Sequence, residues 1–169
     1  MADTAKVAFL KLLNRDNSIS YTESDIEIGN PTTNTDSEAS AKNTAVVLTG
    51  KPAANRTGTV TVYYDRLDIG SLSGGELDLP WDEGGETEIV DLLPKINSAL
   101  NINLTPADIV SSVIVGAVNG SVSFELVAAA ASYGWFGTLT LNLAPPMTDL
   151  NDVITVTDLN GFNIADLQD

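Results

Sequence analysis

The sequence predicts a β-rich α+β fold of two similar units in tandem, each a helix followed by antiparallel strands. The first observation behind this prediction is that residues 9–26 match residues 92–109 at an offset of 83. The second is that strand-like segments follow one another with no helix between them. The third is a Gly-Thr pair before alternating β-formers, at Gly58 and again at Gly137. A unit of about 65 residues is marginal alone, so we expect the two units to share one core.

Each unit is expected to begin with a short helix. The apolar residues of the matched segments recur three apart and stop at a polar break, which is typical of one helix face followed by a turn. In the second unit we expect Leu93 and Ile96 to lie in the core and Asn97 to cap or turn the chain. The predicted helices span residues 4–16 and 87–100.

A Thr-x-x-Asp motif follows each predicted helix, as TESD from Thr22 to Asp25 and as TPAD from Thr105 to Asp108. Threonine is a frequent N-cap residue, and proline is favoured at the first helical position. The motif therefore predicts a single helical turn that leads into a strand beginning at Asp25 or at Asp108.

Alternating apolar and polar residues predict the strands. Within the glycine-rich stretch 71–86, Leu77, Leu79 and Trp81 alternate, so part of this stretch is expected to pair as an edge strand. The segment 30–43 has no apolar residue larger than alanine and is expected to form a loop. The predicted strands are 25–29, 43–50, 58–69, 108–117, 120–131, 136–143 and 152–158. The predicted division is a first helix/β unit at 1–72, an acidic Gly-rich joint at 73–87, and a second helix/β unit with a C-terminal tail at 88–169.

The composition argues against several classes of function. The 169 residues include 23 acidic and 8 basic ones, a net charge of −15, and such a field repels nucleic-acid backbones. Histidine and cysteine are absent, which removes the commonest general base, thiol nucleophiles and zinc sites built on these residues. No apolar run is long enough to span a bilayer, and the N-terminus lacks a signal-peptide pattern. We therefore expect a non-enzymatic protein that uses no cofactor and binds neither nucleic acid nor a membrane.

Carboxylate-rich segments are weak candidates for cation binding. The best oxygen-rich cluster is Asp149, Asn151 and Asp152, but it lacks the D-x-D-x-D-G spacing of a calcium loop. The acidic run 81–86 is better explained as a flexible linker. We therefore expect no metal site.

Aromatic and edge-strand residues are the candidates for contacts with a partner. Tyr133, Trp135 and Phe136 lie in the stretch SYGWFG, which either presents an exposed anchor or closes one end of the core. The other interface candidates are Leu77, Leu79 and Trp81 of the predicted edge strand, and Phe162 of the tail. Unpaired strands can be completed by a neighbouring chain, and residues 77–81 and 152–158 are the candidate edges.

Three phrases carry a resemblance to a known family: LLPKINSALNINLTPADI, GTVTVYYDRLDIGSL and FGTLTLNLAPPMTDLNDVITVTDLNGF. Together they resemble a repeated domain of unknown function in virion structural proteins of large tailed bacteriophages, over roughly residues 5–164. The phrases are short and low in chemical content. The chain departs from the expected pattern after Phe162, where Asn163 and Ile164 replace a Tyr-Pro-like pair.

The resemblance implies a structural role in the phage particle, assembled in the host cytoplasm and held by protein–protein contacts. Expected partners are other virion proteins, either the major capsid protein or tail and neck proteins, with the chain multicopy or homo-oligomeric. The short chain without an extended fibre region favours capsid decoration over a neck, tail or baseplate component. A surface- or carbohydrate-binding β module is the alternative, and it predicts open aromatic side chains beside carboxylates.

Overall fold

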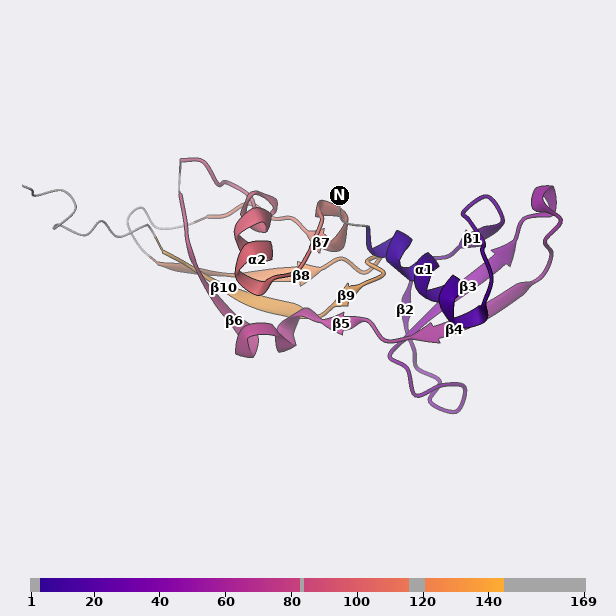
Figure 1. Cartoon of the computed structure of the whole chain (residues 1–169). Helices are drawn as coiled ribbons and strands as arrows, with labels where there is room; N and C mark the ends of the chain where they lie inside the picture. The colour runs from indigo at the N-terminus through magenta and orange to yellow at the C-terminus, as the bar shows by residue number, and fades with distance from the viewer. Residues whose placement is uncertain (1–3, 83, 116–120, 145–169) are drawn as a thin grey trace, which may run out of the picture.

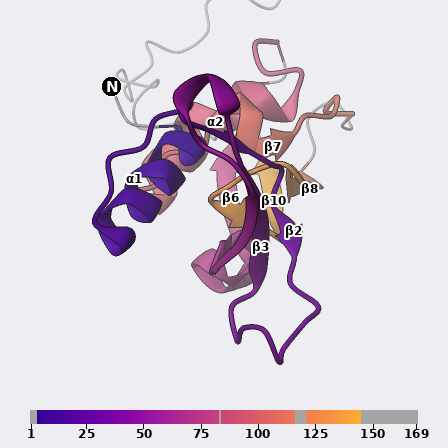
Figure 2. The ribbon, with the colours of Figure 1, turned by 90° about the vertical axis from the view of Figure 1, so that its right-hand side faces the viewer.

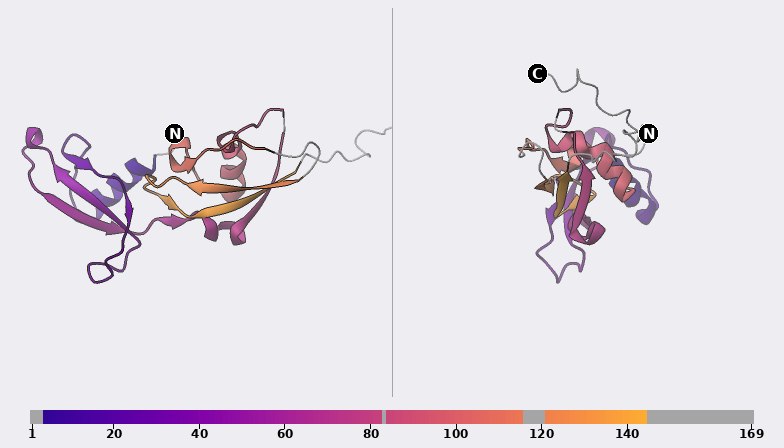
Figure 3. Two further views of the ribbon diagram at one scale, coloured as in Figure 1. Left: turned by 180° about the vertical axis from the view of Figure 1, so that it is seen from behind. Right: turned by 90° about the vertical axis from the view of Figure 1, so that its left-hand side faces the viewer.

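The structure, a computed structural model, describes residues 4–82, 84–115 and 121–144. It is a mixed α/β, β-rich fold with antiparallel sheets, as the sequence predicts at this level. Two larger sheets lie end to end, each with one helix, and a short two-stranded sheet joins them (Figure 1; Figure 3). No helix in these ranges is long and apolar enough to cross a membrane.

The first sheet is built around a central strand that pairs on both edges. Along one edge β3 pairs with β1 and β2, and along the other it pairs with β4, all antiparallel. The helix α1 lies on one face of this sheet (Figure 2). Thr4 caps α1 by accepting a hydrogen bond from the Val7 amide, and Ser18 ends it in a left-handed conformation. The bounds are α1 (Ala5–Asn17), β1 (Ile26–Ile28), β2 (Thr32–Thr33), β3 (Thr44–Gly50), η1 (Pro52–Ala54) and β4 (Thr59–Tyr64).

The second sheet has the order β6-β10-β8-β7, with β6 parallel to β10 and the other pairs antiparallel. Strands β5 and β9 pair in parallel and form the short connecting sheet. The bounds are β5 (Leu67–Asp68), η2 (Ile69–Gly75), β6 (Glu76–Pro80), η3 (Ile89–Leu92), α2 (Leu93–Leu100), η4 (Pro106–Asp108), β7 (Ile109–Val110), β8 (Val122–Ala128), β9 (Trp135–Phe136) and β10 (Thr138–Ala144).

Most predicted elements are present, with four differences. The predicted helix 87–100 is α-helical only from Leu93, because the 3₁₀ turn η3 takes up Ile89–Leu92. The predicted strand 58–69 is interrupted at Asp65 and Arg66, which separate β4 from β5. Over its described residues 108–115, the predicted strand 108–117 consists of β7 and an isolated bridge at Val113, and its first residue belongs to η4. The predicted loop 30–43 contains the two-residue strand β2. The predicted strand 152–158 lies outside the described residues.

The expectation of one shared core is wrong, because the buried apolar side chains in the described ranges form two clusters. Each helix packs against its own sheet, and the inner faces of two sheets placed end to end do not meet (Figure 1). We call these clusters the first core and the second core. The first core is Phe9, Leu13, Ile26, Ile28, Val46, Leu48, Tyr64 and Tyr133. The second core is Ile69, Leu77, Leu79, Trp81, Ile89, Leu92, Leu93, Ile96, Leu104, Ile109, Ile114, Leu126, Trp135, Leu139, Leu141 and Leu143.

Candidate interaction site

A buried polar cluster lies where the two sheets meet. Arg66 donates from Nε to the Thr44 hydroxyl at 3.0 Å and from Nη1 to the Ser132 carbonyl at 3.2 Å. Asp108 accepts from the Ser132 hydroxyl at 2.7 Å through one carboxylate oxygen and from Thr105 through the other. Both oxygens of Asp108 are therefore engaged in hydrogen bonds that fix turns.

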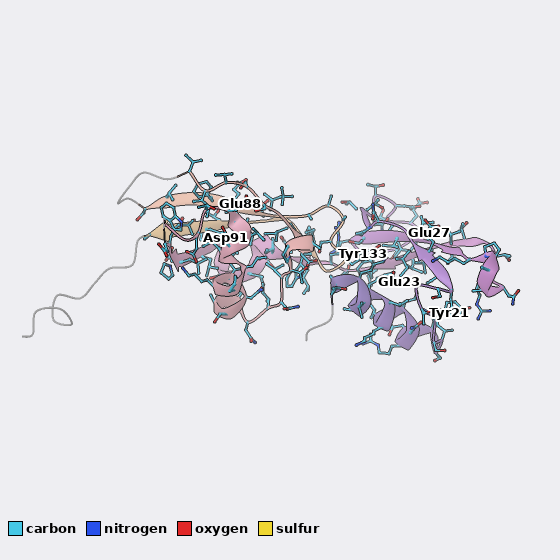
Figure 4. The ribbon with its side chains drawn as sticks, turned by 90° about the horizontal axis from the view of Figure 1, so that it is seen from above. Tyr21, Glu23, Glu27, Glu88, Asp91 and Tyr133 are labelled. Carbon is cyan, nitrogen blue, oxygen red and sulfur yellow. The ribbon has the colours of Figure 1, made fainter. Side chains whose placement is uncertain are left out.

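Tyr133 links the second half of the chain to the first core. Its hydroxyl donates to the Gly29 carbonyl at 2.9 Å, and its own carbonyl accepts from the Tyr64 hydroxyl at 2.9 Å. Phe9 stacks against both tyrosine rings, with centroid distances of 4.9 and 5.5 Å. Burial raises the pKa of both phenols, so both are protonated and can donate at neutral pH. Figure 4 shows Tyr133 between the two halves of the molecule.

The structure places most of the predicted interface residues inside the molecule. Trp135 belongs to the second core and Tyr133 to the first, so the stretch SYGWFG closes the ends of two cores. Phe136 is half-buried beneath the Arg66 guanidinium, 5.8 Å from its ring centroid. The predicted edge strand is confirmed as β6, but Leu77, Leu79 and Trp81 all face the second core. Their burial leaves these side chains little surface for a partner, so any contact here would use the backbone of β6, which is the outer strand of its sheet.

The tail candidates lie beyond the described ranges. Phe162 and the weak cation candidates Asp149, Asn151 and Asp152 are among them. Among the described residues, no group of three or more acidic side chains is placed to hold a metal ion.

The two matched segments make the same hydrogen bonds. Asn14 bridges the amide and carbonyl of Tyr21 at 2.9 and 2.8 Å, and Asn97 does the same to Leu104 at 2.7 and 2.8 Å. The carboxylate of the Thr-x-x-Asp motif accepts from the threonine amide and hydroxyl in both segments. In the first segment, these bonds from Thr22 hold the pKa of Asp25 below its ordinary value.

The Asn bridges give a matched pair of stability predictions. We expect Asn97→Ala and Asn14→Ala each to lower the free energy of unfolding by about 1–2 kcal/mol, because each leaves two backbone groups of a turn without their partner. The losses should be additive in the double variant, since the two turns lie in different cores. Denaturant unfolding measures all three changes. Loss of stability confined to one variant would contradict the equivalence of the two turns.

One edge of the second sheet is covered by β6. This strand pairs with residues 140–144 of β10, and beyond it the Trp81 amide donates to the Ala144 carbonyl at 2.8 Å. Leu77 and Leu79 thereby enter the second core beneath α2. A strand added to β10 thus completes both the hydrogen bonding of this edge and the packing behind it.

The corresponding edge of the first sheet is open. Within the described ranges β4 pairs with β3 alone. The Gly50 amide bonds to the Gly58 carbonyl, and hydrogen-bonding residues alternate along an antiparallel strand. It follows that Val60, Val62 and Tyr64 direct their backbone groups toward β3, whereas Thr61 and Tyr63 direct theirs toward the open edge.

A groove of about 740 Å³ runs along this open edge, between β4 and α1. Val60 stands opposite the buried Leu48 on the core-facing side of the sheet, yet 56% of Val60 is exposed. Lys42 forms an ion pair with Asp65 at 2.7 Å and holds the pKa of that carboxyl below its ordinary value. The groove is lined by Phe9, Leu12, Leu13, Arg15, Asp16, Asn17, Ala39, Ser40, Lys42, Thr61, Val62, Tyr63, Tyr64 and Asp65.

Comparison with known proteins identifies a family and no named relative. A family model described as "Family of unknown function (DUF7941)" matches residues 1–169. No curated protein and no solved structure matches the chain.

Proposed function

We propose that this chain, which belongs to the family of unknown function DUF7941, is a non-enzymatic structural protein of a bacteriophage particle. The observation that carries a structural role is the open edge of β4 with its groove, which offers backbone and apolar groups to another protein. The buried polar side chains at the joint are engaged in hydrogen bonds within the chain that fix turns. The phage setting rests on the resemblance of the three sequence phrases.

We also propose that the chain contains two copies of one helix-plus-strands unit. Support comes from the paired Asn bridges and from two equivalent hairpins, in which Gly50 bonds to Gly58 and Ala128 bonds to Gly137. Both hairpin glycines, Gly58 and Gly137, have φ of +85°. In each half the strand after the Thr-x-x-Asp turn pairs with the first hairpin strand.

Within the particle, capsid decoration is the position we favour, with a neck, tail or baseplate position as the alternative. A carbohydrate-binding role is less favoured, because the two tryptophans are buried in the second core and offer no open aromatic surface.

The test is quantitative mass spectrometry of phage particles purified by density gradient from the lysate in which this protein is made. We expect the protein to remain with the particles, in hundreds of copies for decoration or in six or twelve for a ring at the neck or baseplate. A variant lacking residues 159–169 measures the contribution of the end of the tail to incorporation. Absence of the protein from washed particles would overturn the proposal.

A further inference from the structure

We propose that the open edge of β4 binds residues 152–158 of a second copy of this chain as a parallel strand, so that copies join head to tail. The inference names a partner for the structural role proposed above, and it rests on that role only for its biological setting. Its physical basis is that the second sheet already contains the arrangement that the first sheet lacks.

The template is the pairing of β6 with β10. Gly58 and Gly137 are equivalent hairpin residues, so residues 61–65 occupy the positions that residues 140–144 occupy in the second sheet. Thr140 and Asn142 pair with β6, and their counterparts Thr61 and Tyr63 point backbone groups at the open edge.

The side-chain packing shows the same difference. Leu77 and Leu79 are buried in one cluster with Leu93 and Ile96 of α2, whereas beside α1 the first sheet has the groove. Leu139 of β10 is fully buried, and its counterpart Val60 is 56% exposed. A strand with two inward apolar side chains would therefore cover both the free backbone groups and the apolar surface of this groove.

The tail has the sequence that this position requires. Residues 152–158 read DVITVTD, and Ile154 and Val156 are two apart, as are Leu77 and Leu79. The tail also has the right place in the chain, because β6 follows the first hairpin and the tail follows the second. The structure leaves residues 145–169 undescribed, which is more than enough chain for such a strand.

Charge favours the same partner. Residues 1–72 hold seven of the eight basic residues and have a net charge of −2, whereas residues 73–169 have a net charge of −13. Residues 145–169 contain five aspartates and no basic residue. Arg15 and Lys42 line the groove and form ion pairs with Asp16 and Asp65, which line it too. The acidic tail of one copy would therefore meet a groove of balanced charge instead of a second strongly acidic surface.

The tail of the same copy does not reach this position. Tyr64 at the end of β4 contacts Tyr133, so β4 runs toward the joint, and β10 leads away from it. At about 3.3 Å per residue, Ala144 and Thr61 are roughly 40 Å apart across the joint. The nine residues from Ala144 to Val153 span at most about 32 Å. A parallel strand on β4 therefore has to come from another copy.

Each copy would donate one strand and accept one. The donating and accepting surfaces differ, so the contact is heterologous and generates a closed ring or an open filament. The second sheet of the donor would stand at the outer end of the first sheet of the acceptor. The sheets of neighbouring copies would then lie end to end, as the two sheets of one copy do.

The test measures self-association of the purified full-length chain by light scattering and sedimentation. We expect concentration-dependent oligomers that are lost on truncation after Thr148 and on the tail substitution Val156→Pro. Val156 corresponds to Leu79 of β6, and residues 77, 79 and 81 turn their amides toward the paired strand. Asp166→Pro, a proline outside the proposed strand, is the matched control and should associate as the wild type does. On the acceptor side Thr61→Pro should abolish association, because it removes an amide that points to the open edge.

Mixing two variants, each defective on one side of the contact, tests the donor and acceptor roles separately. The Thr61→Pro chain keeps the donor strand, and the truncated chain keeps the acceptor edge, so the two should form a 1:1 dimer that grows no further. Circular dichroism and thermal unfolding check that each variant is folded. The cysteine-free chain also allows a Tyr63→Cys, Thr155→Cys variant, whose disulfide should link separate copies in the parallel register.

A wild-type chain that stays monomeric, or a truncated chain that still self-associates, would overturn the inference. So would folded donor and acceptor variants that fail to form the mixed dimer. Because these measurements use purified protein, their failure leaves incorporation into particles as a separate result. Conversely, strand exchange in vitro with no protein in particles would overturn only the phage setting.

Discussion

Leu141→Ala is expected to lower the free energy of unfolding by about 3–5 kcal/mol, the upper part of the range for large-to-small core substitutions. Leu141 is fully buried at the centre of β10, with Leu77 beside it on one strand and Phe124 on the other. Because strands flank it on both sides, the neighbours have little freedom to close the cavity. Denaturant unfolding followed by tryptophan fluorescence measures this loss, since both tryptophans of the chain lie in the second core.

The matched control is Val62→Ala at the equivalent position of β4. Val62 is half-buried and lines the groove, so we expect a loss of roughly 1 kcal/mol, from about 0.8 kcal/mol per buried methylene. The difference between the two variants measures how much more closed the second core is than the first. Equal losses would show that the edge of β4 is covered in the isolated chain, contrary to the open edge described above.

Local features of this fold were predictable from the sequence, because they depend on residues close together in the chain. The helix α1, the C-terminal end of α2, the η4 turn at Thr105 and the core positions Leu93 and Ile96 all follow from spacing within a few residues. The predicted start of α2 is too early, because the 3₁₀ turn η3 precedes it. The edge strand at Leu77 and Leu79 was also visible as an alternation within a glycine-rich stretch. Each of these local patterns predicts whether a segment is a helix, a turn or a strand, but not which other strand or helix it packs against.

The number of cores and the open edge were not predictable, because they depend on which distant strands pair. β6 pairs with β10 across more than 60 residues of chain, and no periodicity encodes the choice of that partner. Two similar units are expected to share one core. Instead, the units lie end to end, and the Tyr64 hydroxyl bonds to the Tyr133 carbonyl where they meet. The pairing of distant segments at the joint also explains why two aromatic candidates for partner contact are buried. Tyr133 packs in the first core and Trp135 in the second.

The second large stability effect is expected at Arg66, where the two sheets meet. Arg66→Ala is expected to lower the free energy of unfolding by about 3 kcal/mol, because it leaves several buried acceptors without their donor at about 1–3 kcal/mol each. Only 8% of Arg66 is exposed, and its guanidinium faces the carbonyls of Ala130, Ser132 and Trp135. Alanine leaves those carbonyls and the Thr44 hydroxyl without their donor, and each unsatisfied buried group is costly.

Two further variants show whether geometry or charge carries this effect. Arg66→Lys keeps the charge but loses the planar fork that reaches Thr44 and the turn carbonyls together, so most of the loss should remain. Arg15→Ala removes a side chain that is 72% exposed and should cost well under 1 kcal/mol. Full stability of Arg66→Lys would assign the effect to charge alone. Because β5 and β9 flank this arginine, a loss at Arg66 should also loosen the two sheets from each other, which hydrogen exchange at Leu67 would detect.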